Sequence, residues 1–236
     1  KSILIDTGCG IDILGQIKKG ANVTQVINSH THPDHSAGNW VFKDVAHSFS
    51  VPEEGFATSG NTVALSERLA EPGWLAEYWR DFVSKTMSFK DCQPTESYNN
   101  EAVFELGEIR LLPMHTPGHT IDHYCFYEPD MKILFSFDYD LTSFGPWYGH
   151  RESSISEFGR SLQMLQELDI ACLVSGHGGI VRSDIKKRLH DFGSKIDERG
   201  KKIRNMLAGA GSTIDELVKS APIYGKYPYA EPLLRY

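Results

Sequence analysis

Apolar and polar positions along this chain of 236 residues follow two patterns, one typical of strands and one typical of helices. Short runs rich in β-branched and aromatic residues, bounded by turn-forming residues, indicate strands. Gly107-Glu108, between two such runs, predicts a two-residue hairpin. The predicted strands cover residues 2–5, 23–28, 102–106, 109–114, 124–127, 132–137 and 171–175.

Apolar residues recur at three- and four-residue steps in the segments that we expect to be helical. Residues 61–87 show this pattern with a break at Glu71-Pro72-Gly73, which predicts two consecutive helices. Residues 154–168 place a row of apolar side chains on one helical face. After Ser183, which resembles an N-cap, helices are predicted to about residue 220, with breaks at Gly209 and Gly211.

Strands that alternate with helices predict an α/β (α+β) fold built on a sheet. We expect one catalytic core over residues 1–182, with a helical insertion at about residues 61–87. Residues 183–236 are expected to form a helical C-terminal extension.

The composition excludes several classes of partner. The net charge is -7, and no run of Lys or Arg is dense enough to follow a phosphate backbone, so we expect no nucleic acid. No apolar stretch approaches the length of a membrane span and no signal peptide is visible, so we expect no membrane partner. The expected partner is a small-molecule substrate, and the sequence leaves the oligomeric state open.

The cysteines favour a reducing compartment. Cys9, Cys92, Cys125 and Cys172 lie far apart without a C-x-x-C pair, which argues against a zinc ribbon or a disulfide framework. We interpret them as small buried apolar side chains of a cytoplasmic protein.

Three imidazoles and a carboxylate lie within the six residues His30-Thr31-His32-Pro33-Asp34-His35. Core packing does not explain so tight a cluster, whereas imidazole nitrogens and carboxylate oxygens are ligands that zinc, iron and manganese accept. Further candidate ligands follow the ends of predicted strands, where sheet-based folds place their chemistry. An isolated histidine is usually structural, but this set predicts a two-metal site completed by His119, Asp138 and His177.

Two residues are candidates for contacts that fix these ligands. Asp6 could hold the far N–H of an imidazole in the histidine cluster, although a turn-forming role beside Gly8 fits equally well. His123 lies four residues after His119, and in an extended strand both side chains would point to the same face.

Aromatic segments raise the question of substrate contacts. Tyr148 and His150 lie in the aromatic segment 140–150 close to Asp138, where they could face the substrate or simply cover the core. The aromatic residues within 61–87 allow a lid over an apolar acyl chain, with ordinary packing on the sheet as the default interpretation.

The order of these residues resembles the metallo-β-lactamase fold superfamily. The resemblance rests on His30-x-His32-x-Asp34-His35 followed by His119, Asp138 and His177, and on Leu4-Ile5-Asp6-Thr7-Gly8 near the start. It implies an αββα sandwich with a dinuclear site at one edge and the helical tail appended. Members normally have one or two strands before the Asp6-type turn that are absent here.

Carried over residue by residue, the resemblance implies one metal on His30, His32 and His119 and a second on Asp34, His35 and His177, with Asp138 bridging the two. Two divalent cations are implied, with zinc favoured and iron or manganese also compatible. Cations roughly 3.5–4 Å apart can share a water and lower its pKa toward about 7. We therefore expect hydrolysis by a metal-bridging hydroxide, with Asp34 and Asp138 as catalytic residues.

The identity of the candidate ligands indicates which branch of the superfamily the chain resembles. His32 stands where the redox flavodiiron members carry Glu, and Asp138 and His35 stand where the first lactamase subclass carries Cys and Arg. The set is similar to that of glyoxalase II, so we expect a hydroxyacylglutathione hydrolase-like enzyme acting on a thioester or related ester. Phe137 departs from the family, which usually has Gly there. The alternatives are a persulfide dioxygenase-like iron enzyme, a lactonase, or a metal-holding protein that senses a ligand.

Overall fold

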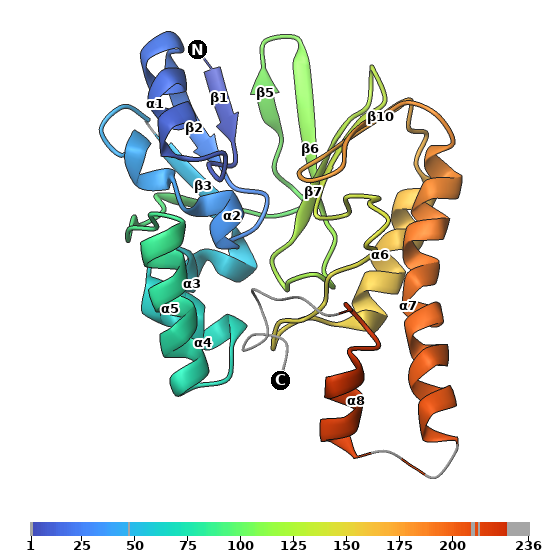
Figure 1. The fold of residues 1–236 in the computed structure, drawn as a ribbon. Helices are drawn as coiled ribbons and strands as arrows, with labels where there is room; N and C mark the ends of the chain where they lie inside the picture. The colour runs from blue at the N-terminus through green and yellow to red at the C-terminus, as the bar shows by residue number, and fades with distance from the viewer. Residues whose placement is uncertain (1, 47, 209–210, 212, 226–236) are drawn as a thin grey trace.

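The computed structural model describes residues 2–46, 48–208, 211 and 213–225. Two sheets face each other at the centre of the fold (Figure 1). The first sheet is parallel throughout, in the order β1 (Ser2–Ile5), β2 (Val23–Ile27), β3 (Ser48–Pro52), β4 (Glu96–Tyr98). The second has the order β10 (Gly179–Val181), β9 (Cys172–Ser175), β8 (Ile133–Phe137), β7 (Tyr124–Glu128), β6 (Ile109–His115), β5 (Phe104–Leu106).

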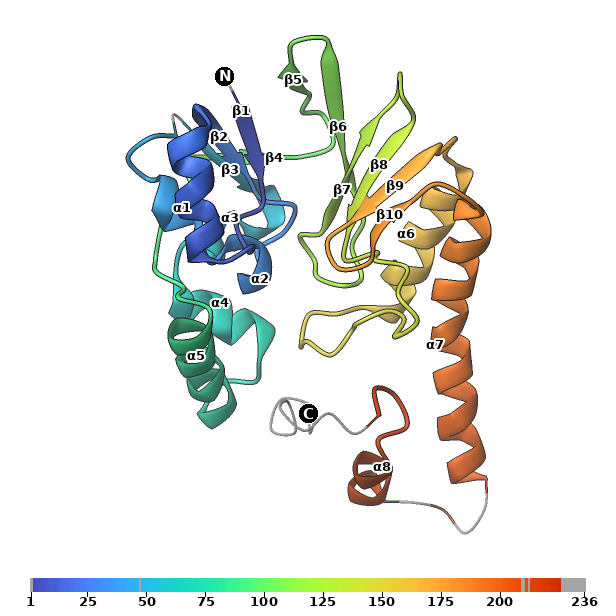
Figure 2. The same ribbon diagram turned by 45° about the horizontal axis from the view of Figure 1, so that its top comes forward.

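Helices cover the outer face of each sheet, as Figures 1 and 2 show. Helix α1 (Ile11–Gly20) packs Leu14 against Val23 and Val26 of β2. Helices α6 (Ile155–Glu167) and α7 (Ile185–Leu207) cover the second sheet. The remaining helical segments are α2 (Pro33–Ser36), η1 (Asn39–Phe42), η2 (Glu53–Gly55), α3 (Phe56–Ser59), α4 (Thr62–Leu69), α5 (Trp74–Thr86) and α8 (Ile214–Ser220).

Apolar packing explains why the layers hold together. Between the sheets, Ile27 and Tyr98 of the first meet Phe104, Phe126 and Phe137 of the second. Burial of aromatic and aliphatic side chains is the main favourable term in folding. The predicted αββα sandwich is confirmed.

The directions of three strands place their C-terminal ends at the same edge of the second sheet. Strands β6 and β8 are both antiparallel to β7, and β9 is parallel to β8. Strands β6, β8 and β9 therefore run the same way and end at the same edge. The segments that follow them are the ones that carry His119, Asp138 and His177.

All seven strands that the pattern predicts are present, and so are the two helices of residues 61–87. Apart from the short helical turns α2, η1, η2 and α3, four elements were not predicted: α1, β3, β4 and β10. Glycines interrupt the pattern of α1. Strands β3 and β4 pair with partners that are distant in sequence, whereas β10 is a strand of three residues that pairs with β9 just before it.

Two predictions about local features are wrong. Asp184, in the left-handed conformation with φ 55° and without a side-chain cap, precedes α7 in the N-cap position that was assigned to Ser183. Cys9 is exposed and Cys92 and Cys172 are half-buried, so only Cys125 fits the interpretation of buried apolar side chains.

Residues near the C-terminus extend the fold beyond the sandwich. Gly211 has φ 79° and lies between α7 and α8, whereas the other predicted break, Gly209, lies outside the described residues, as do residues 226–236 of the predicted extension.

In the part of the chain that the structure describes, no helix has the length and apolar character needed to cross a membrane.

Candidate metal centre

The histidine loop connects β2 to α2. Proline at position 33 begins α2, and His32 just before it has the extended conformation that a residue preceding proline prefers. The short helix turns Asp34 and His35 back toward the sheet edge. His30, His32 and His35 are buried, whereas the side chain of Asp34 is 41% exposed.

The second sheet supplies the other candidates from the turns after its strands. His119 follows Gly118, whose φ is 133° and where a Cβ would lie 2.4 Å from the backbone of Phe158, so the turn requires glycine. Asp138 follows Phe137 at the end of β8, and His177 follows Gly176, whose N–H donates to the carbonyl of Phe137 at 3.0 Å.

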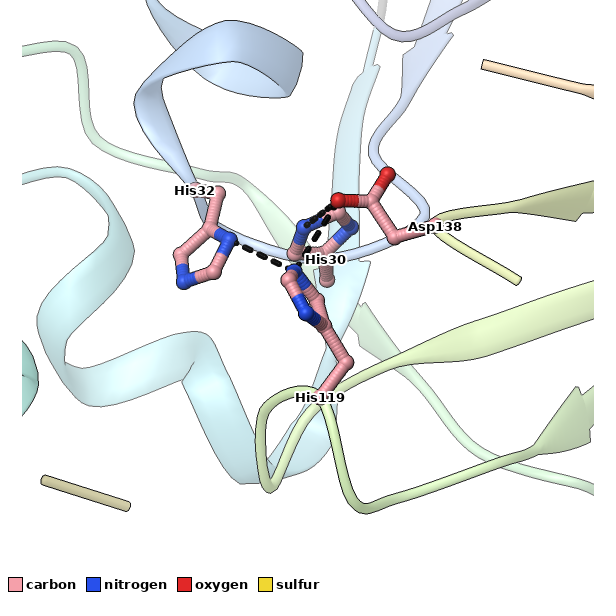
Figure 3. A group of neighbouring side chains, drawn as sticks. All are labelled: His30, His32, His119 and Asp138. Atoms are coloured by element: carbon pink, nitrogen blue, oxygen red, sulfur yellow. Dashed lines mark hydrogen bonds and ion pairs between the residues drawn. The ribbon is translucent and has the colours of Figure 1, made fainter. Parts of the chain in front are cut away.

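The first group of side chains consists of His30, His32, His119 and Asp138. Figure 3 shows the three rings and the carboxylate turned toward a common centre. His119 Nε2 lies 3.0 Å from Asp138 Oδ2 and 2.9 Å from His32 Nδ1, and His30 Nε2 lies 4.0 Å from the same carboxylate oxygen.

The second group consists of Asp34, His35, Asp138 and His177. His35 Nε2 and His177 Nε2 lie 2.8 and 3.4 Å from Asp138 Oδ1. His177 Nε2 is also 3.5 Å from Asp34 Oδ2. The Asp138 carboxylate therefore presents one oxygen to each group, and both groups are able to hold a metal ion.

The donor atoms fit a cation better than a hydrogen-bonded core. His30 Nε2 is buried and has no hydrogen-bond partner among the described residues. An unpaired buried nitrogen costs roughly 1–3 kcal/mol, which a bound cation would offset. Burial, together with His35, keeps the pKa of His30 well below its ordinary value, and burial does the same for His32. Both rings are thus neutral at pH 7, the form that binds metals.

The groups around Asp138 favour the ionised form of its carboxyl group. Burial works against its ionisation, but His35 and His119 hold the pKa of this carboxyl well below its usual range. Burial likewise opposes protonation of His35, yet Asp138 and Asp6 raise its pKa well above the ordinary value. Asp138 is therefore an anion in a pocket that favours positive charge, as a bridging ligand must be.

In His35 and His119, the ring nitrogen that faces away from the centre has a partner. Asp6 Oδ2 lies 2.7 Å from His35 Nδ1 and also accepts a hydrogen bond from Ser29 Oγ. Asp6 has φ 58°, so it is a turn residue and a contact to the loop at once. The carbonyl oxygen of Trp147 lies 3.0 Å from His119 Nδ1. Such contacts orient imidazoles and leave the opposite nitrogen for a ligand role.

His123 lies behind the site, but for a different reason than expected. Residues 116–123 form turns, so the even spacing from His119 along an extended strand does not apply. The ring is buried 5.0 Å from that of His30 between centroids, with Nδ1 2.8 Å from Thr116 Oγ1, and burial lowers its pKa well below the ordinary value.

The structure separates the two candidates of the aromatic segment. The ring of the half-buried His150 lies 4.4 Å from that of His32 between centroids, and loss of solvent around it, with the nearby His119 and Arg68, lowers its pKa to about 3. Tyr148 instead contacts the C-terminal part of the chain, with its ring centroid 5.6 Å from that of Tyr224.

The aromatic residues of α5 divide between two environments. Trp79 is buried against Leu65 and Leu69 of α4, which agrees with the default interpretation of packing. Tyr78 and Phe82 are each 40% exposed on another face of the helix. The lid stays a prediction.

Sequence reasoning missed a buried ionic network beneath the histidine loop. Thr31 Oγ1 donates to Asp122 Oδ2 at 2.6 Å, and Arg68 Nη2 donates to Thr31 Oγ1 at 2.5 Å. Arg68 also lies 2.9 Å from Glu152 through Nε and 3.3 Å from Asp122 through Nη2. No motif in the sequence indicates this network, because its residues lie far apart along the chain.

Two buried carboxylates share the single guanidinium of this network. Burial raises the pKa of Glu152 to about 7 although Arg68 opposes the shift. Thr31 lies between the candidate ligands His30 and His32. Through Arg68 and Glu152, the network links it to helix α4 and to the segment before α6.

Comparisons with known proteins agree with this geometry. A family model described as the metallo-beta-lactamase superfamily matches residues 1–177. The acyl-coenzyme A thioesterase MBLAC2 of Homo sapiens is 31% identical over 191 residues, covering 71% of this chain and 64% of that protein. An atrochrysone carboxyl ACP thioesterase of Aspergillus fumigatus is 24% identical, covering 83% of this chain and 37% of that one. The chain thus spans less than two thirds of the length of these relatives.

Solved structures share the fold. A metallo-beta-lactamase family protein from Thermus thermophilus superposes with a TM-score of 0.72 at 24% identity, covering 98% of this chain and 82% of that chain. A beta-lactamase domain protein from Burkholderia ambifaria gives a TM-score of 0.71 at 16% identity, covering 99% and 76%.

Proposed function

The chain belongs to the metallo-beta-lactamase superfamily, and from this premise we propose that it is a two-metal hydrolase that cleaves acyl thioesters. The observation that carries the proposal is the placement of Asp138. Its two carboxylate oxygens face two separate groups of ligand atoms, each completed by histidines. A single carboxylate between two such groups is the arrangement that a bridging ligand requires.

The proposed ligands are His30, His32 and His119 for one ion and Asp34, His35 and His177 for the other, with Asp138 between them. Zinc is the favoured metal because imidazole and carboxylate are its common ligands, and iron and manganese accept the same set. When bound, a pair of such cations supplies Lewis-acid activation of the substrate carbonyl and lowers the pKa of water.

Exposure indicates the side from which the substrate approaches. The side chains of Asp34 and His177 are 41% and 46% exposed, whereas the ligands of the first group are buried. The carbonyl group would therefore enter beside Asp34, and in this proposal the Asp34 carboxylate accepts a proton from the attacking water. Asp6 keeps His35 oriented while this happens.

The choice of thioesters rests on the relatives. Two different groups of them are described as thioesterases, one for acyl-coenzyme A and one for an acyl carrier protein. In both cases the acyl group is bound to sulfur. An acyl-coenzyme A is thus the first substrate to test, and the glyoxalase II-like specificity predicted from the ligand order becomes the second.

Two hydrolysis assays test the proposal: thiol release reports cleavage of a thioester, and acid release reports cleavage of a lactone. Protein stripped of metal and then reloaded with zinc would be offered acyl-coenzyme A thioesters of several chain lengths, S-lactoylglutathione and a lactone. We expect turnover of a thioester that disappears with chelator and returns with zinc. Turnover of the lactone alone, or one iron per chain with oxygen consumption on a persulfide, would contradict the proposal.

Substitution of the bridging residue makes the test specific. Asp138→Asn keeps the size of the side chain and removes the charge, so we expect activity to fall on the order of 100-fold or more and the metal content to fall below two ions per chain. Asp130→Asn is the matched control, because that carboxylate is 69% exposed in a surface pair with Arg110. The control should keep both metal ions and full activity.

A further inference from the structure

The C-terminal part of the chain reaches back to the segment that borders the candidate metal centre. Arg199 of α7 is only 5% exposed, which is unusual for an arginine. Its Nη1 donates to the carbonyl of Pro146 at 2.6 Å, and its Nη2 donates to the carbonyl of Phe144. One guanidinium thus holds two backbone carbonyls of this segment.

Tyr224, which follows α8, holds the same segment from a second position. Its hydroxyl accepts a hydrogen bond from the backbone N–H of Tyr148 at 2.8 Å. Its ring stacks on Trp147, with centroids 4.5 Å apart, and on Phe144 at 5.4 Å. The Arg199 guanidinium carbon lies 4.9 Å from the centroid of the Tyr224 ring, so the two residues also support each other.

The segment that Arg199 and Tyr224 contact has no regular secondary structure. Residues 139–153, all of which the structure describes, form no helix or strand, so their carbonyls lack the regular hydrogen bonds of such elements. Gly145 has φ 81°, and a Cβ there would lie 2.8 Å from the side chain of Lys195, which shows how closely the segment packs on α7.

Along the chain, the carbonyl group of Trp147 lies between the two anchored carbonyls and the anchored N–H of Tyr148. Its oxygen contacts a candidate ligand. The carbonyl oxygen of Trp147 lies 3.0 Å from His119 Nδ1. A proton on Nδ1 that is donated to this carbonyl leaves Nε2, 3.0 Å from Asp138, with a free lone pair for a metal.

We propose that Arg199 and Tyr224 are positioning residues for His119: they fix residues 144–148 so that the Trp147 carbonyl holds the imidazole in the orientation and tautomer of a ligand. The proposal rests on the proposed metal centre and adds a role for a region beyond residue 177, where the match to the family model ends. His35 and His177 have no such link to the C-terminal region in the contacts described above, so the effect belongs to one ion of the pair.

Stepwise metal titration of the full chain tests this inference without any substrate. Protein stripped of metal would be titrated with cobalt(II) in competition with a chromophoric chelator, which resolves the two binding steps and reports ligand geometry through the cobalt spectrum. We expect Arg199→Met to weaken one step by about tenfold or more, as the loss of a ligand's orienting partner does, and to leave the other within about twofold. Arg199→Lys should recover part of the loss, because one ammonium can reach only one carbonyl.

Two further variants keep the test interpretable. Arg204→Met removes an exposed arginine from the same helix and should titrate like the wild type. Tyr224→Phe keeps the stacked ring and removes only the hydroxyl, so it serves if Arg199→Met fails to fold. It should weaken the same step by a few-fold, consistent with the loss of one hydrogen bond. Amide exchange in residues 144–148 should accelerate in each affected variant.

The outcomes separate the two proposals. If the wild-type chain binds no cobalt, the proposed metal centre fails. If the wild type binds two ions and folded Arg199→Met or Tyr224→Phe binds both with unchanged affinity, the positioning role is overturned. Equal weakening of both steps would also overturn it, because that result indicates a general loss of structure.

Discussion

Phe137 occupies a backbone conformation that suits glycine. Its φ of 47° costs a residue with a Cβ roughly 1–2 kcal/mol. The ring offsets this cost, since it is buried between the sheets with its centroid 5.4 Å from that of Phe126. The conformation gives a physical reason for the glycine usual at this position in the family that the sequence resembles. The ring packs in the apolar core between the sheets, with Ile27 and Tyr98.

Two substitutions separate the strain at Phe137 from its packing. Phe137→Ala and Phe137→Gly both lose the ring and should lower the free energy of unfolding by about 3–5 kcal/mol. The glycine variant should nevertheless be more stable than the alanine variant by about 1 kcal/mol, because it relieves the positive φ. Urea unfolding at a fixed zinc concentration would measure the difference, and an alanine variant that is the more stable of the two would disprove the strain.

Glu152 should make the stability of the protein depend on pH. Its folded pKa of about 7 lies above the ordinary value of 4.5, so the folded protein binds a proton more tightly than the unfolded chain. The resulting stabilisation is complete below pH 4.5 and is lost as the pH rises through about 7. A shift of this size corresponds to roughly 3 kcal/mol.

Glu152→Gln removes this dependence, because glutamine does not titrate. Relative to the wild type, we expect the variant to gain up to about 3 kcal/mol of unfolding free energy between pH 5 and pH 8, measured in urea. Glu167→Gln, on the exposed face of α6, is the control and should follow the wild type. A constant difference between Glu152→Gln and wild type over this range would rule out the raised pKa.

At the level of single residues, the sequence was informative where side chains able to bind a metal lie close together along the chain. Three histidines and an aspartate in six positions predicted a ligand cluster, and the structure gathers all seven candidate ligands. Arg68 and Glu152 could not be predicted, because they are 84 positions apart and only tertiary folding buries them as a pair. The same holds for Arg199, because the sequence of α7 contains several basic residues and nothing in it distinguishes the one that is buried.

Helices and strands were likewise predicted where their own sequence determines them, and were missed where they depend on residues distant in the chain. Long periodic segments such as α6 and α5 were predicted because their apolar faces repeat within a few residues. Strand β4, of three residues, was not predicted, since its apolar pattern is too short and it exists through pairing with β3 some 46 residues earlier. Short edge strands depend on their neighbours more than on their own composition.

The turn between β6 and β7 tests how the end of a strand places a candidate ligand. Gly118→Ala would put a Cβ 2.4 Å from the backbone of Phe158 at a φ of 133°, so we expect a loss of about 3 kcal/mol or more in unfolding free energy. Because His119 is the next residue, metal affinity should fall as well. Chemical unfolding and chelator competition would measure the two effects.

Gly159→Ala is the matched control for this turn. Gly159 lies within α6 next to Phe158, and nothing lies within 4 Å of a Cβ added there. Alanine in a helix interior should leave stability unchanged or raise it by up to about 1 kcal/mol. Equal behaviour of the two variants would show that the tight turn at Gly118 has no role.

For the whole molecule, the central feature is that the candidate site joins the two sheets. The histidine loop follows β2 of the first sheet, whereas His119, Asp138 and His177 follow strands of the second. Bound cations would therefore cross-link the two halves of the sandwich. The sequence predicted the sandwich and the candidate ligands, whereas the contact between residues 144–148 and the C-terminal region is visible only in the three-dimensional structure.

Metal removal should therefore destabilise the fold as a whole. A ligand present at about 1,000 times its dissociation constant adds roughly 4 kcal/mol, which for a chain of this size raises the melting temperature by about 10 °C. We expect chelator to lower the melting temperature by that order and zinc to restore it. Asp138→Asn should show a much smaller response in the same calorimetric scan. A wild-type melting temperature indifferent to chelator and zinc would show that the sheets are not linked by metal.

The most direct measurement is anomalous diffraction from crystals of the zinc-loaded chain, recorded on both sides of the zinc absorption edge. We predict two anomalous peaks roughly 3.5–4 Å apart, one within bonding distance of His30, His32 and His119 and the other of Asp34, His35 and His177, with the Asp138 carboxylate between them. No peak, a single peak, or peaks without Asp138 between them would contradict the two-metal centre on which the proposed hydrolase depends.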